Sequence, residues 1–110
     1  MSKKLFLPSD QIKPLVNDLG TCIATDKIAV QGLPVRFMYR EAPVMAGDSG
    51  WRFLSGLESD AYMENANNQG AYDVNLIANI DPTVIPLLSA PIDAAFEKTE
   101  AEQQKAIEEI

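Results

Sequence analysis

Residues 35–55 read VRFMYREAPVMAGDSGWRFLS, and this stretch decides the fold. Its two ends, 35–41 and 51–55, are rich in aromatic and aliphatic residues, and the residues between them include proline, glycine, aspartate and serine. Two such runs separated by turn-forming residues predict a pair of antiparallel strands. The alternation along the two runs predicts one shared buried face, made by Val35, Phe37, Tyr39, Trp51 and Phe53.

Further elements are expected on the N-terminal side of this pair. Residues 11–19 carry apolar side chains at helical spacing, with a helix-starting Pro-Ser-Asp before them and Gly20 after them. Residues 21–25 are β-branched and small, which favours a third strand. We therefore expect an N-terminal helix that leads directly into the sheet.

On the C-terminal side, residues 72–80 fit a strand and a helix equally well, because their apolar side chains match both periods. A capping box at 99–102 predicts a helix near the C-terminus. The elements expected here are short helices at 59–65 and 82–88, a strand at 92–96 and a helix at 100–109.

Together these elements predict one α+β domain over residues 1–110, which is the usual size of a single hydrophobic core. We expect a small antiparallel sheet with helices packed on one face, and extra helices at both termini. Residues 22–96 form the expected core of the domain, and residues 97–110 form an acidic helix or tail.

The composition excludes several kinds of chemistry. The chain has 110 residues, a net charge of −7, no histidine and one cysteine, Cys22. Imidazole-based catalysis, histidine-ligated metals, internal disulfides and cysteine-cluster zinc sites are therefore excluded. We expect Cys22 to be a buried core thiol. No nucleophile elbow or phosphate-binding loop is present in the sequence, so we expect no enzymatic activity, no metal and no cofactor.

The same composition bears on partners and location. An acidic chain has the wrong sign to bind nucleic acid. The sequence contains no apolar stretch of about 20 residues and no secretory signal pattern, so we expect no membrane association. A lone cysteine is typical of a reducing cytoplasm. The oligomeric state is left open.

The acidic charge is concentrated in the middle of the chain. Residues 41–96 contain eight acidic residues and one basic residue, Arg52. Such a segment can attract a basic protein partner and speed its association. A solvated acidic surface that only keeps the protein soluble is the alternative.

Nine residues are candidates for partner binding: Asp48, Trp51, Arg52, Glu58, Asp60, Tyr72, Asp73, Asn75 and Asp81. Trp51 has a second interpretation, as a core residue packed with Phe53 and Phe37. The short polar residues Asp73, Asn75 and Asp81 also have a second interpretation, because aspartate and asparagine commonly brace turns and cap helices.

Three blocks, in this order, resemble the bacterial immunity protein 33 family: GLPVRFMYRE at 32–41, DSGWRFLSG at 48–56 and YDVNLIANIDP at 72–82. The likeness runs over residues 22–96. It implies a small α+β domain and neutralisation of a toxin by direct binding, and it supplies no catalytic residues.

The leading hypothesis is therefore a non-enzymatic bacterial binding protein, similar to an immunity protein, that blocks a basic toxin through its acidic surface. The alternative is a cytoplasmic accessory or regulatory domain that binds a small ligand, with Trp51 and Tyr72 as pocket walls.

Overall fold

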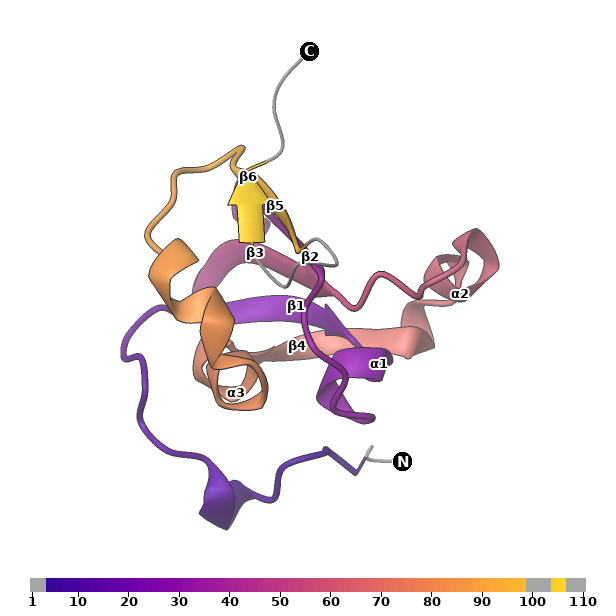
Figure 1. Cartoon of the computed structure of the whole chain (residues 1–110), viewed down its shortest axis with the longest axis horizontal. Coiled ribbons are helices and arrows are strands. Elements are labelled where there is room, and N and C mark those ends of the chain that lie inside the picture. The colour runs from indigo at the N-terminus through magenta and orange to yellow at the C-terminus, as the bar shows by residue number, and fades with distance from the viewer. Residues whose placement is uncertain (1–3, 99–103, 107–110) are drawn as a thin grey trace.

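A computed structural model describes residues 4–98 and 104–106, which build a six-stranded mixed sheet with short helices (Figure 1). The strands are β1 (Thr21–Thr25), β2 (Phe37–Arg40), β3 (Asp48–Leu54), β4 (Gln69–Asp73), β5 (Ala95–Lys98) and β6 (Gln104–Ala106). The α-helices are α1 (Asp26–Ala29), α2 (Asp60–Glu64) and α3 (Val74–Ile80), and the 3₁₀ segments are η1 (Ser9–Gln11), η2 (Ala66–Asn68) and η3 (Pro82–Leu87). The expected α+β class is confirmed.

The strand order is β4-β1-β3-β2-β5-β6. The antiparallel pair β2–β3 is confirmed, with residues 41–47 as its connection. The expectation of a purely antiparallel sheet is wrong, because β1 pairs in parallel with β3. Parallel neighbours need a long connection, and residues 26–47, with α1 and β2, supply it.

The register of β2 against β3 overturns the expected shared aromatic face. Met38 lies opposite Phe53, and Tyr39 lies opposite Arg52. Paired residues share a face, so Phe37 and Tyr39 lie on the side of the sheet opposite Phe53. The face that carries Met38 is therefore the buried one.

The hydrophobic core lies between one face of the sheet and the helices α1, α3 and η3. The strands contribute Cys22, Ala24, Met38, Trp51 and Phe53, and the helical segments contribute Ile28, Val74, Leu76, Ile77 and Val84. Cys22 is the expected core thiol, and burial raises its pKa well above the usual range.

The expected N-terminal helix over 11–19 is wrong. Only η1 forms, and the chain then runs as an irregular segment below α3, at the lower left of Figure 1. Pro14 lacks an amide hydrogen, and Asp18 adopts a positive φ of 62°, so the segment cannot complete a helix. Ile12 and Val16 nevertheless pack against the core, as apolar residues at that spacing should.

The expected C-terminal helix over 100–109 is wrong where the structure describes it. Residues 104–106 form β6, which pairs with β5 in antiparallel fashion. The rest of that helix, 100–103 and 107–109, lies outside the described residues. Residues 97 and 98, assigned by sequence to the tail, belong to β5.

Two short elements follow the sequence signals closely. The Ser59 side chain accepts a hydrogen bond from the Tyr62 amide and caps α2, as expected. The ambiguous segment 72–80 is both strand and helix: β4 ends at Asp73, which caps α3. Within the described residues no helix is long and apolar enough to cross a membrane.

Candidate functional site

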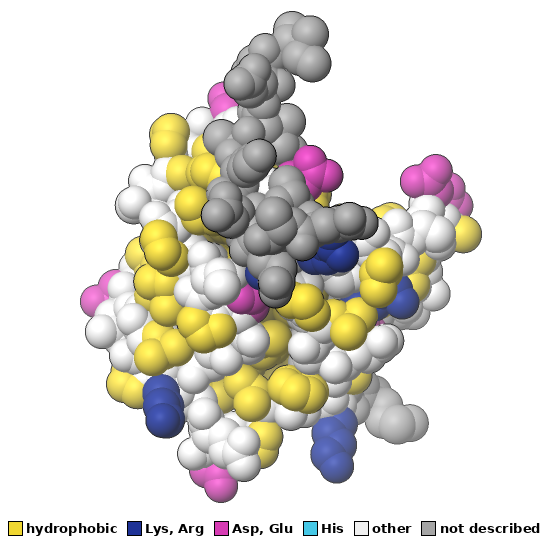
Figure 2. Space-filling view, in the orientation of Figure 1, with side chains coloured by type: hydrophobic (Ala, Val, Ile, Leu, Met, Phe, Trp, Pro, Cys, Tyr) yellow, Lys and Arg dark blue, Asp and Glu magenta, His cyan; other side chains and the backbone are white. Residues whose placement is uncertain are grey.

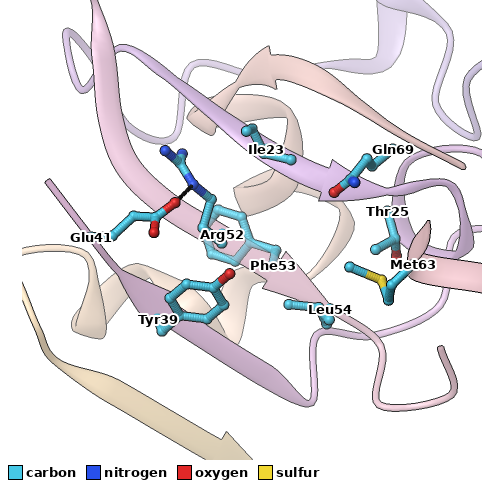
Figure 3. Close-up of a pocket in the computed structure, with 9 residues that line it drawn as sticks. All are labelled: Ile23, Thr25, Tyr39, Glu41, Arg52, Phe53, Leu54, Met63 and Gln69. Carbon is cyan, nitrogen blue, oxygen red and sulfur yellow. Dashed lines mark hydrogen bonds and ion pairs between the residues drawn. The ribbon is translucent and has the colours of Figure 1, made fainter. Parts of the chain in front are cut away.

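The face of the sheet that points away from the core, here called the outer face, carries a pocket of about 150 Å³ (Figure 3). Strand side chains form its floor and sides, and Met63 of α2 closes one end. The residues that line it are Ile23, Thr25, Tyr39, Glu41, Arg52, Phe53, Leu54, Met63 and Gln69.

Arg52 is the charged residue at the base of this pocket, and it is buried with 4% of its surface exposed. Its Nη1 and Nη2 donate to the two carboxylate oxygens of Asp48 at 3.0 and 2.9 Å, a bidentate pair. Its Nε donates to Glu41 Oε2 at 2.6 Å. Two carboxylates therefore neutralise one buried guanidinium and leave the triad with a net charge of −1.

Gly50 makes the pair between Asp48 and Arg52 possible. Residues four apart in a regular strand lie about 13 Å from each other, too far for an ion pair. Gly50 adopts a φ of +89°, and the register of β1 against β3 shifts at this point, which marks a bulge. A Cβ at Gly50 would meet the Glu41 carbonyl oxygen at 2.1 Å, so the position requires glycine.

The Gly50→Ala variant is expected to lower the free energy of unfolding by about 2–3 kcal/mol, through backbone strain and the collision with Glu41. Gly47→Ala is the matched control, because Gly47 also has a positive φ but meets nothing within 4 Å. It is expected to cost about 1 kcal/mol. Urea denaturation of both variants measures the difference, and equal losses would contradict the role of the bulge.

Asp48 is held in its ionised form. Its side chain is 5% exposed, and the hydrogen bond from Arg52 keeps its pKa well below the usual range despite burial. The Val44 and Gly50 amides donate to the same carboxylate. Asp48 therefore braces the connection between β2 and β3 from the first position of β3, and both of its carboxylate oxygens are engaged.

Glu58 is similarly engaged. Its carboxylate accepts hydrogen bonds from the Thr25 and Ser55 hydroxyls and from the Ser55 and Gly56 amides. Burial opposes ionisation of Glu58, but these hydrogen bonds outweigh it and lower the pKa. Glu58 thus braces the turn after β3 against the end of β1.

Asp81 is a buried junction between distant segments. Its carboxylate accepts hydrogen bonds from the Val35 amide at 2.9 Å and Lys98 Nζ at 3.1 Å, and from the amide and hydroxyl of Thr83. Burial raises the pKa of Asp81, but these donors outweigh the effect and the pKa is lowered. The sequence-based alternative, in which this residue braces a turn, is what the structure contains.

Asn75 and Asn79 fasten the N-terminal segment to α3. Asn75 Oδ1 accepts from the Leu15 and Val16 amides, and its Nδ2 donates to the Lys13 carbonyl. Asn79 binds the amide and carbonyl of Lys13. The sequence singled out Asn75 but missed Asn79, whose spacing of four residues on one helix was the available signal.

The other candidates lie in different places. Trp51 is 1% exposed, stacks on Phe53 with 6.1 Å between ring centroids, and donates from Nε1 to the Leu88 carbonyl. It is a core residue, and Phe37 lies on the other face.

Tyr72 lies on β4 outside the pocket, opposite Cys22. Asp60 and Asp73 are exposed, in the first turn of α2 and at the cap of α3.

Of the nine residues that line the pocket, only Arg52 is among the candidates from the sequence, and the two polar residues Tyr39 and Glu41 matter most among the others. Tyr39 and Glu41 both lie in the block at 32–41, but Tyr39 was assigned to the core and Glu41 was only counted as charge. Burial, followed by the nearby Glu41 carboxylate, raises the pKa of Tyr39, so its hydroxyl stays protonated at neutral pH. Within the described residues no cluster of three or more potential ligands could hold a metal ion.

Stability is expected to fall at both ends of the pH range. Asp48, Glu58 and Asp81 have folded pKa values below the unfolded value of about 4, so their stabilisation is present above that pH and is lost as the pH falls toward the folded values. Cys22 has a raised pKa, so the folded state also loses stability above about pH 9.

The melting temperature should therefore be flat from about pH 5 to 8 and lower on either side. Circular dichroism melts at a series of pH values test this expectation. The melting temperature of Asp48→Asn should fall less steeply at acid pH than that of the unmodified protein. A melting temperature unchanged down to about pH 2 would contradict the linkage.

The model of the Immunity protein Imm33 domain matches residues 22–108 of this chain. The chain belongs to the Imm33 family. The match confirms the resemblance over residues 22–96 and extends it through β5 and β6, so the six strands, except Thr21 of β1, lie inside the Imm33 domain. No curated protein and no solved structure matches the chain.

Membership of the Imm33 family indicates an immunity-type function, in which a protein partner, the toxin, is bound. The N-terminal segment 4–20 and Thr21, the first residue of β1, lie outside the Imm33 match. The pocket on the outer face and the triad of Glu41, Asp48 and Arg52 lie inside the Imm33 domain.

Proposed function

We propose that this protein is a cytoplasmic immunity protein that neutralises a basic bacterial toxin by direct contact and without catalysis. The match to the Imm33 domain over residues 22–108 carries the proposal. The contact surface we propose is the outer face together with α2, which borders the pocket through Met63.

Charge supports this surface. The chain carries a net charge of −7. Within this total, the triad at the pocket has a net charge of −1, and α2 contributes Asp60 and Glu64, which are both exposed. In Figure 1, α2 projects from the right of the molecule, and Figure 2 shows acidic side chains at the tip of this projection. An acidic projection beside a pocket can steer a basic partner toward it.

The first test is protection from a toxin. The gene product encoded beside this protein is expressed with and without it, and the two purified chains are mixed for calorimetry. We expect growth arrest only when the neighbour is expressed alone, and a one-to-one complex in solution. A neighbour that is harmless alone, or that forms no complex, would remove the proposal.

Charge reversal must avoid the internally bonded carboxylates Asp48 and Glu58, so Asp60 is the position to change. Asp60→Lys is expected to slow association with the toxin several-fold at low salt and to have little effect at high salt. Asp10→Lys is the matched control, because Asp10 is also exposed in the first turn of a short helical segment. Stopped-flow association rates compare them, and equal slowing would argue against a directed acidic surface.

A small-ligand domain is the second candidate, and the pocket is the observation in its favour. Its volume of about 150 Å³ is below the roughly 300–1,000 Å³ typical of small-molecule sites, and neither Trp51 nor Tyr72 lines it. The pocket is therefore better suited to one side chain of a protein partner. A metabolite that raises the melting temperature reproducibly would favour the second candidate instead.

A further inference from the structure

The pocket on the outer face presents two oxygen atoms with unused capacity to accept hydrogen bonds. Glu41 uses Oε2 for Arg52, while its Oε1 makes no hydrogen bond to the part of the chain that the structure describes. The Tyr39 hydroxyl likewise makes none to the described residues, and Figure 3 shows it pointing into the pocket. Both atoms belong to side chains that are only partly buried, so a partner can reach them.

The charged group inside the pocket does not favour an anionic occupant. Arg52 already donates to Asp48, to Glu41 and to the Trp51 carbonyl. A carboxylate entering the pocket would have to displace Glu41 and would meet a site with a net charge of −1. A cation meets favourable charge and two free acceptors.

The pocket walls suit an alkyl stem. Ile23, Leu54 and Met63 provide apolar surface around the polar base. A protein cavity of about 150 Å³ can hold a benzene ring, so a pocket of this volume is on the scale of one long side chain. Lysine and arginine combine such a stem with a terminal group that only donates hydrogen bonds.

We propose that the outer-face pocket binds one lysine or arginine side chain of the toxin, whose cationic head is held by Glu41 Oε1 and the Tyr39 hydroxyl. This inference rests on the proposed immunity function, and it adds the chemical class that the partner must present. The alkyl stem of that side chain lies against Ile23, Leu54 and Met63. Arg52, which is paired with Asp48, holds Glu41 in place through the hydrogen bond from its Nε to Glu41 Oε2.

The first test needs no toxin. Isotope-labelled protein is titrated with N-acetyl-arginine amide or N-acetyl-lysine amide at millimolar concentrations, with N-acetyl-leucine amide as the neutral probe, and amide shifts are followed by NMR. We expect saturable shifts at Ile23, Tyr39 and Leu54 with at least one cationic probe and none with the neutral probe. No saturable shift with either cationic probe, or equal shifts with the neutral one, would overturn the proposal.

The variant that tests the two acceptors is Tyr39→Phe combined with Glu41→Gln. It keeps both side-chain shapes, and it is expected to weaken probe binding about tenfold or more. Glu97→Gln is the matched control, because Glu97 lies on the same face, paired with Phe37, but outside the pocket. If Glu97→Gln weakened probe binding equally, the effect would come from the overall charge of the face, and the proposed cation site would be overturned.

The toxin assay separates this inference from the proposed function. If the unmodified protein protects cells and the double variant loses about tenfold in toxin affinity, both are supported. If the unmodified protein protects and the double variant binds equally well, the pocket is wrong and the immunity function stands. If the unmodified protein gives no protection while the probe titration succeeds, the immunity function is wrong and the cation pocket remains.

Discussion

Arg52→Met is expected to lower the free energy of unfolding by about 3–5 kcal/mol, because it leaves the Asp48 carboxylate buried without its counter-ion. Asp48 is 5% exposed at its side chain and would retain only its two backbone donors, Val44 and Gly50. A loss of this size is a large part of the total stability of a domain, which is typically about 5–15 kcal/mol. Urea denaturation followed by tryptophan fluorescence measures it.

Arg36→Met is the matched control for this change. Arg36 is exposed, and the hydrogen bond it donates to Leu54 comes from its backbone amide, which the substitution keeps. We expect an effect within about 0.5 kcal/mol. Glu41→Gln should also cost little, because the Glu41 side chain is 48% exposed and the amide oxygen can still accept from Arg52.

A double-mutant cycle with Asp48→Asn tests whether Asp48 and Arg52 act as a pair. Removal of both charges should cost less than the sum of the two single losses, because no unpaired charge then stays buried. Additive losses, or a loss below about 1 kcal/mol for Arg52→Met, would show that solvent reaches the pair.

Trp51→Ala is expected to lower the free energy of unfolding by about 3–5 kcal/mol, since it empties a large part of the core. Trp51 packs against Phe53 and Phe96, and the Arg40 guanidinium lies 5.7 Å from its ring centroid. Trp51→Phe keeps an aromatic ring and loses the hydrogen bond to Leu88, so a loss of about 1–2 kcal/mol is expected.

The Trp51→Phe variant also decides between the two interpretations of Trp51. If Trp51 is only a core residue, folded Trp51→Phe protein should bind the toxin with unchanged affinity. Calorimetry under conditions where the variant is fully folded provides this measurement. A tenfold loss of affinity in Trp51→Phe, with its fold intact by circular dichroism, would assign a contact role to Trp51.

Local patterns were sufficient for the elements that depend on neighbouring residues. The strand at 21–25, the strands that lie within 35–41 and 51–55, and the Ser59 cap of α2 were visible in the sequence, because propensity and capping act within a few residues. The turn-forming stretch at 42–50 is shorter than the sequence indicates, because Asp48, Ser49 and Gly50 belong to β3. The three blocks that resemble the immunity family were visible for the same reason, since they are short and continuous.

The tertiary structure decided which faces and which charges meet. The register of β2 against β3 put Tyr39 on the outer face, because a one-residue offset moves every side chain of a strand to the other side. The Gly50 bulge turned Asp48 from a candidate surface acid into the partner of Arg52. Proline and a positive φ at Asp18 left 11–19 to be fastened by Asn75.

The sequence by itself therefore determined the class of fold, the family and the excess of acidic residues. Only the tertiary structure determined which of those acidic side chains are accessible to a partner. Asp48, Glu58 and Asp81 are bonded within the molecule, while Glu41 and Asp60 remain accessible. The physical reason is that a carboxylate is exposed or engaged according to donors far away in the chain, such as Val35 for Asp81, and no local pattern records them.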